Sequence, residues 1–269
     1  MHGPVIRDHQ DKDPMIQKIK TACRAGMHTP DYKLKPLLGC PLVTYQKRVI
    51  IPKSLREDLV DWYHQNLGHP DPERQFKTMH QILYWLSMES HRLGNVSPTK
   101  AHSGKQDYGL LPPRTLKTVN PWDIVHVDLI GPYKNNGYDI TMIDQATRWL
   151  EVGIQPDEDS RTTAESLIVS GSVGNLAHAK LSTIKDLNSQ VINSPAQLRA
   201  KPVISKNPQA NAICERVHLE ILNVIRCYED VDWTKAVHNA AFAVRASNHS
   251  ILNVPPGQLT FDQDMISRQ

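Results

Sequence analysis

The chain has 269 residues, a formal net charge of +3, 39% hydrophobic residues and 22% charged residues. This composition is typical of a soluble globular protein with more than one domain, and so weak a basic charge does not by itself indicate nucleic-acid binding. No apolar run is long enough to cross a bilayer and no signal peptide is visible, so we expect an intracellular protein, nuclear or cytoplasmic, with reduced cysteines.

The first 44 residues do not read as an independent domain. Their pattern predicts a short helix over residues 13–25, followed by extended chain in the stretch that contains Pro30 and Pro36. We therefore interpret residues 1–44 as an N-terminal extension or a linker.

Residues 45–103 predict a small helical domain. A short strand at 48–52 precedes Ser54, and Glu57 follows three residues later, which is the arrangement of a capping box at the start of a helix. A second helix is expected over 71–84. The polar, proline-containing segment 104–119 then reads as a linker.

Residues 120–269 predict a mixed α/β domain. In the first strand, Val125, Val127 and Leu129 alternate with Asp128, which places the carboxylate on the opposite face. An Asn-Gly pair within 134–137 indicates a hairpin. The expected strands are 124–130, 138–143, 148–154 and 181–185, and the expected helices are 160–173, 210–227 and 233–247.

Three acidic residues stand in three recognisable settings. They are Asp128 in WDIVHVDLIGPY, Asp186 in IKDLNSQ and Glu215 in NPQANAICERVH. Taken singly, each acid is more often a turn or cap residue or a partner of the helix dipole. Delivered together from separate elements, three carboxylates can hold divalent metal ions for phosphoryl transfer, because hard cations prefer oxygen ligands.

The order of these blocks resembles the integrase of gypsy-type LTR retrotransposons, in the retroviral integrase group. The blocks MIDQATRWLEV and AVRASNH, and then PPGQLTF, match further parts of the pattern, and the resemblance covers about residues 45–266. It implies an RNase H-like core, in which a mixed sheet is flanked by helices, after a small zinc-binding-type helical domain.

The resemblance also implies an enzyme, a DNA polynucleotidyl transferase of the DDE type. Asp128, Asp186 and Glu215 would hold two Mg²⁺ or Mn²⁺ ions for 3′-end processing and strand transfer. The expected partners are the element's DNA ends, target DNA and further copies of the chain, and no membrane is expected. The residues expected to contact DNA are Lys206, Asn207, Gln209, Asn211, Arg216 and His218.

The chain departs from the family's zinc site. The family pairs histidines equivalent to His64 and His69 with a downstream CxxC, but Ser97 and Lys100 stand at the matching positions. Serine is a weak zinc ligand and lysine is a cation at neutral pH, so we do not expect Zn²⁺ to bind. His91 and His102 remain as alternative ligands.

A second departure concerns the catalytic core. The segment between Asp186 and Glu215 is about seven residues shorter than the family's, and the glycine that usually follows the second acid is absent. We therefore expect activity to be reduced or lost. The alternatives are a non-catalytic remnant of a retroelement that binds nucleic acid or protein, and a nuclease of the RNase H type.

Overall fold

The computed structural model describes residues 2–27, 31–88, 119–133, 137–157, 180–182, 208–228 and 231–266. These residues form two compact units. The described parts of Met1–Thr99 and Ala246–Gln269 make unit 1, and those of Lys100–Arg245 make unit 2. None of the helices in the described ranges is long and apolar enough to span a membrane.

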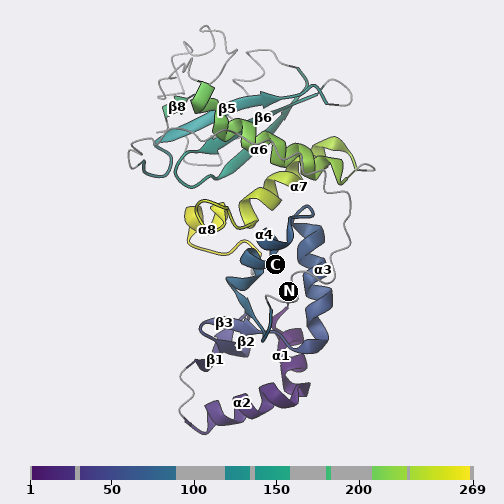
Figure 1. Ribbon diagram of the computed structural model, residues 1–269, viewed down its shortest axis with the longest axis vertical. Coiled ribbons are helices and arrows are strands. Elements are labelled where there is room, and N and C mark those ends of the chain that lie inside the picture. The colour runs from purple at the N-terminus through teal and green to yellow at the C-terminus, as the bar shows by residue number, and fades with distance from the viewer. Residues whose placement is uncertain are drawn as a thin grey trace. The chain divides into compact units, whose positions relative to one another are not determined.

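Unit 2 is a mixed α/β domain built on a four-stranded sheet with the strand order β7-β6-β5-β8. Figure 1 shows this sheet, with β5, β6 and β8 labelled. The strands β5, β6 and β7 are antiparallel neighbours, whereas β8 runs parallel to β5. The mixed sheet flanked by helices that the sequence predicted is therefore confirmed. The elements are β5 (Ile124–Ile130), β6 (Tyr138–Asp144), β7 (Leu150–Gln155), β8 (Lys180–Ser182), α6 (Pro208–Arg226) and α7 (Trp233–Ala246).

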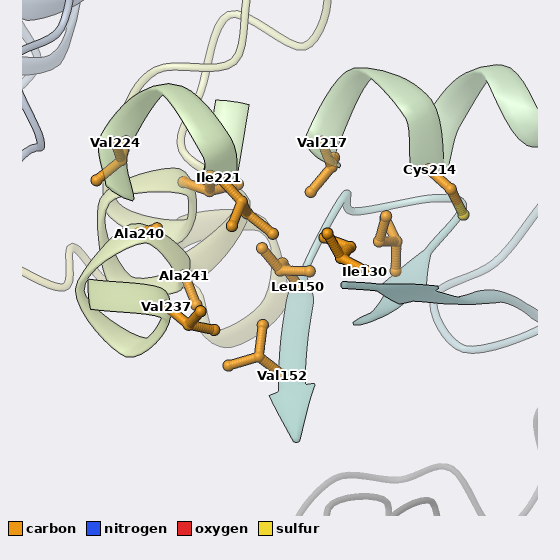
Figure 2. Close-up of a cluster of buried hydrophobic side chains, with 12 residues drawn as sticks. Ile130, Leu150, Val152, Cys214, Val217, Ile221, Val224, Val237, Ala240 and Ala241 are labelled. Carbon is orange, nitrogen blue, oxygen red and sulfur yellow. The ribbon is translucent and has the colours of Figure 1, made fainter. Parts of the chain in front are cut away.

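The two faces of this sheet carry separate apolar clusters, as strand alternation requires. Val125 and Val127 lie with Ile140 and Met142 on one face, and Leu129 packs against them. Figure 2 shows the cluster on the opposite face, where sheet residues meet the helices α6 and α7. Its members include Ile130, Ile143, Leu150, Val152, Cys214, Val217, Ile221, Val224, Val237 and Ala240.

The buried stripe of α6 follows from its sequence. Cys214, Val217, Ile221 and Val224 recur every three or four residues and are all buried, whereas Glu215 is exposed. The predicted hairpin joins β5 to β6, and the backbone N–H of Tyr133 donates to the carbonyl of Gly137 across its base. The turn residues 134–136 and the predicted helix 160–173 lie outside the described residues.

Unit 1 contains a second four-stranded sheet, with the order β1-β2-β3-β4. The strands β1, β2 and β3 are antiparallel neighbours, and β4 is parallel to β3. The elements are α1 (Gly3–Lys12), α2 (Pro14–Arg24), β1 (Tyr32–Leu37), β2 (Cys40–Tyr45), β3 (Arg48–Ile50), the 3-10 helix η1 (Lys53–Leu55), α3 (Arg56–Asn66), α4 (Pro72–His80), β4 (Leu83–Tyr84) and α8 (Pro256–Phe261).

The N-terminal 44 residues differ from the extended segment that the sequence suggested. The helix predicted over 13–25 is present as α2, but β1 and β2 form a hairpin, and α1 packs on β2. The buried amide of Gln10 replaces a missing strand partner, because it donates to the carbonyls of Val43 and Ile50 and accepts from the N–H of Val43. Pro36 is tolerated because β1 is an edge strand.

Two local predictions in unit 1 were wrong. Ser54 does not cap α3, because it lies in η1 and its hydroxyl contacts His9 Nδ1 at 2.9 Å. The helix predicted over 71–84 ends at His80, and Leu83–Tyr84 form β4 beside β3 instead. Asp71 does cap α4, since its carboxylate accepts from the N–H groups of Glu73 and Arg74.

The segment that follows α7 belongs to unit 1, whereas the sequence had assigned it to the core. The backbone N–H of the buried Asn248 donates to Thr78 Oγ1 on α4 at 2.9 Å. Gln81 Nε2 donates to the carbonyl of Asn253 at 3.3 Å. These two hydrogen bonds attach residues 246–266 to α4 and the turn after it.

Candidate functional site

Asp128 lies in the middle of β5, opposite Thr141 of β6 in the antiparallel register. Its side chain is half-buried on the face that α6 covers, and its Oδ1 accepts the backbone N–H of Leu129 at 3.0 Å. The alternation of β5 therefore presents a carboxylate on the face that packs against α6.

Glu215 lies on α6, which packs against β5 and β6. The thiol of the neighbouring Cys214 is buried, and its pKa is raised to about 12 by burial first, then by Asp128, and then by Glu215. Glu215 is next to Cys214 in the chain, whereas Asp128 belongs to another element. The effect of Asp128 on the Cys214 thiol therefore places this carboxylate in the neighbourhood of the α6 turn that contains Cys214.

Asp186, the third predicted acid, lies outside the described residues. The strand that leads toward it is described from Lys180 to Ser182, and it pairs with Ile124–His126 of β5 in parallel. Because the two strands are parallel, the backbone of β8 runs in the same direction as β5, from the Ile124 end toward the Ile130 end.

A hydrogen-bonded link joins α6 to the sheet beside Asp128. Thr141, which is fully buried, donates from Oγ1 to the carbonyl of Asp128 at 3.1 Å. The same oxygen lies 3.0 Å from Nε2 of His218 on α6. Burial lowers the pKa of His218 to about 4, so its imidazole is neutral at neutral pH.

Two arginines flank this region. Arg216 is exposed on α6, and Arg148 is half-buried in the turn before β7. The pKa of Arg148 is lowered by burial and by the positive charge of Arg216, while Asp144 raises it. The carboxylate of Asp144 is itself bonded to the N–H of Trp122 and to Thr147. Arg148 and Arg216 therefore lie close enough for their positive charges to interact.

The structure describes only some of the residues predicted to contact DNA. Lys206 and Asn207 lie outside the described residues, and for Gln209 and Asn211 only the helical backbone is described. Arg216 is exposed, whereas His218 is hydrogen-bonded to Thr141 within the unit. Of this set, only Arg216 is described as an exposed side chain on α6.

The predicted zinc histidines lie together in unit 1. The rings of His64 and His69 stand 4.8 Å apart between centroids, and His64 Nδ1 contacts Gln75 Oε1 at 3.1 Å. Ser97, Lys100, His91 and His102 lie outside the described residues. No group of three or more His, Cys, Asp or Glu side chains within the described ranges is placed to hold a metal ion.

The carboxylates of Asp128 and Glu215 suit a divalent ion such as Mg²⁺ better than the two histidines, His64 and His69, suit Zn²⁺. Carboxylate oxygens are the ligands that Mg²⁺ and Mn²⁺ prefer, and both Asp128 and Glu215 offer them. A zinc site would need two further ligands beside His64 and His69. The residue types at the first site therefore fit the metal that the sequence resemblance implies.

Sequence reasoning missed Thr141. A threonine within a strand reads as an ordinary β-former, and it stands 77 positions from His218 in the chain. Its signal was the hairpin register, because pairing Asp128 with a residue of β6 selects Thr141 as the neighbour.

Comparisons with known proteins find similarity to solved structures. No protein-family model and no curated protein matches the sequence. The structure is similar to the crystal structure of the catalytic core domain of BIV integrase in crystal form I, with 13% sequence identity and a TM-score of 0.42. The match covers 52% of this chain and 95% of that chain.

Proposed function

We propose that this chain is a gypsy-type retrotransposon integrase that processes DNA 3′ ends and joins them to target DNA with the help of divalent metal ions. The supporting observation is that Asp128 on β5 lies close enough to α6 to raise the pKa of the buried Cys214 thiol, and Cys214 is next to Glu215 in the chain. Carboxylates delivered from a strand and from the helix packed on it are what a phosphoryl-transfer site requires.

Each residue has a role in this proposal. Asp128, Asp186 and Glu215 would hold two Mg²⁺ or Mn²⁺ ions, which would supply charge neutralisation and activation of water or a 3′-hydroxyl. The exposed guanidinium of Arg216 contacts a DNA phosphate, which positions the DNA end without reading its sequence. Lys206, Asn207, Gln209 and Asn211 extend this contact along the approach to α6.

The proposal includes that the activity of this chain is reduced or lost. The connection between Asp186 and Glu215 is about seven residues shorter than the family's, and Leu187 and Asn188 follow Asp186 where the family has Asn and Gly. A displacement of Glu215 by about 1 Å would lower the rate by about two orders of magnitude, because the reacting groups must be held in place.

A non-catalytic remnant is the second candidate function, and a specific observation favours it. Ser97 and Lys100 replace both cysteines of the zinc site, so the domain proposed for residues 45–103 lacks half of its ligand set. A remnant would still bind DNA through its phosphate contacts. It would associate with further copies of the chain, in the nucleus or in the cytoplasm. It would lack metal-dependent chemistry.

Strand transfer on a matched DNA end, with Mg²⁺ or Mn²⁺, tests the proposal. The integrase proposal predicts weak joining that is abolished by Asp128→Asn, Asp186→Asn and Glu215→Gln, since each removes a charged ligand and nearly preserves shape. The matched control is Glu220→Gln, farther along α6. Joining that persists in all three variants would refute the choice of residues, and preferential cleavage of an RNA–DNA hybrid would identify an RNase H-type nuclease.

A further inference from the structure

The polar link between Thr141 and His218 stands where two strands and a helix meet. Thr141 is fully buried on β6, its hydroxyl donates to the backbone of Asp128 on β5, and its oxygen contacts His218 on α6. Around it lies the apolar cluster that joins the sheet to α6 and α7. Two apolar side chains would fill this place without burying any polar atom. The hydrogen-bonded pair of Thr141 and His218 instead requires one particular geometry, so it adds specificity to the packing.

The chemistry of the hydroxyl fixes the direction of both hydrogen bonds. A threonine hydroxyl carries one proton, and a carbonyl oxygen can only accept, so the proton of Thr141 points to Asp128. The second contact, at 3.0 Å, must then be donated by His218. The imidazole is therefore in the tautomer that carries its proton on Nε2, and a neutral ring suffices for this bond.

The link bears directly on the two carboxylates. His218 follows Glu215 by three residues, which is nearly one turn of α6, so a bond that fixes the His218 turn also fixes the rotation and height of the turn that carries Glu215. At its other end the link is attached to the backbone of Asp128 itself. It therefore spans the distance between the elements that present the two acids.

We propose that Thr141 and His218 are positioning residues that hold the carboxylate of Glu215 in place relative to Asp128. This inference rests on the proposed metal site, and it assigns His218 an internal role in place of the DNA contact that the sequence suggested. Groups that orient metal ligands from outside typically change metal affinity about tenfold to a hundredfold when they are removed.

Mn²⁺ affinity, measured by calorimetry or by paramagnetic resonance of the free ion, tests this inference. We expect Thr141→Val to weaken Mn²⁺ binding about tenfold or more, because it removes the hydroxyl and keeps the shape. Thr141→Ser retains the hydroxyl and should bind like the wild type. His218→Leu should repeat the loss, and His218→Gln, which retains an N–H donor, should recover part of the affinity.

The matched control is Thr44→Val in unit 1. Thr44 is also buried within a strand, and its hydroxyl also donates across a strand pair, to the carbonyl of Lys33 at 3.0 Å. It should lose a similar amount of stability and no Mn²⁺ affinity. A merely structural role for Thr141 would make Thr44→Val and Thr141→Val behave alike in both measurements.

A spectroscopic measurement follows the link without any metal. Nitrogen-15 NMR of the side chain should show His218 as the neutral tautomer protonated at Nε2, with slow exchange of that proton, and Thr141→Val should remove the slow exchange. A tautomer protonated at Nδ1 in the wild type would overturn the inference.

The outcomes separate the inference from the proposed function. Wild-type binding that depends on Asp128 and Glu215 but is unchanged in Thr141→Val overturns the positioning role alone, and so does a Thr141→Ser variant as weak as Thr141→Val. Loss of DNA affinity in His218→Gln equal to that in Arg216→Gln would return His218 to the DNA surface and overturn the inference. A wild-type protein that binds no Mn²⁺ overturns the proposed function and the inference with it.

Discussion

The rings of His64 and His69 meet edge to face, 4.8 Å apart between centroids and at 77° between their planes. Burial lowers the pKa of His69, and the neighbouring His64 lowers it further. Nδ1 of His64 contacts Oε1 of Gln75, and its buried Nε2 has no hydrogen-bond partner among the residues that the structure describes. The two histidines that match the family's zinc ligands thus lie side by side in unit 1.

Zinc content is the first prediction. The purified protein should hold well under one equivalent of Zn²⁺, because Ser97 and Lys100 stand where the family has cysteines. Cysteine at both positions should raise Zn²⁺ affinity and stabilise unit 1 against denaturation. Atomic absorption gives the stoichiometry. One full equivalent in the wild type, lost on changing His64 or His69, would mean that other residues complete the site.

DNA binding should depend on Arg216. Replacing its exposed guanidinium with glutamine should weaken binding to all DNA sequences alike and reduce the slope of log affinity against log salt by about one. Arg226→Gln, an exposed arginine in the last turn of the same helix, is the control. Asp128→Asn should retain DNA affinity. Fluorescence anisotropy at several salt concentrations measures both quantities, and equal slopes for the two arginine variants would contradict the assignment.

A buried acid should make the stability of unit 2 depend on pH. Asp139 is fully buried on β6, neither of its carboxyl oxygens accepts a hydrogen bond of normal geometry within the described residues, and the backbone of Gly153 offsets only part of the cost of burial. Burial raises its pKa from 3.8 to about 8. Its neighbour Tyr133, whose ring stacks on Trp233 at 4.9 Å, has its pKa raised by burial and by Asp139.

The folded protein therefore keeps a proton on Asp139 at pH values where the unfolded chain has released it. The free energy of unfolding should fall as the pH rises from about 4 to about 8, by at most about 1.4 kcal/mol per pH unit from this group. Asp139→Asn should remove this dependence, so its stability relative to the wild type should increase between pH 5 and pH 8. Urea denaturation at several pH values checks this, and a constant difference would show that Asp139 has an unshifted pKa.

The apolar contact between α6 and the sheet should be the main source of stability in unit 2. Ile221 is fully buried in this contact (Figure 2), so Ile221→Ala should cost about 2–5 kcal/mol of unfolding free energy. Leu219→Ala, two residues away on the same helix but exposed, should change it by at most about 0.5 kcal/mol. Equal losses in the two variants would mean that α6 is held to the sheet in another way.

The parts of the fold that the sequence predicted are those with strong periodicity. Val125 and Val127 alternate with Asp128 along β5, and Val217, Ile221 and Val224 recur along α6, so the burial of both elements could be predicted without knowledge of their partners. The two strands β1 and β2 were missed, because they are short and contain Pro36 and Pro41, which normally interrupt a strand.

The parts that could not be predicted depend on contacts between distant residues. Ser54 has the local pattern of a helix cap, yet its hydroxyl contacts His9, 45 positions away. His218 has the pattern of a polar residue on an exposed helix face, yet its side chain is hydrogen-bonded to the buried Thr141. In both cases a tertiary hydrogen bond replaced the local one, and periodicity carries no information about such partners.

A structure determined with Mn²⁺, using anomalous scattering to locate the ion, tests the central claim most directly. The account predicts a Mn²⁺ ion bound by carboxylate oxygens of Asp128 and Glu215, at the distance of about 2.0–2.2 Å that is usual for such small divalent ions, and lost in Asp128→Asn. Anomalous density that is absent between these two side chains at millimolar Mn²⁺, or present only elsewhere in the molecule, would contradict it.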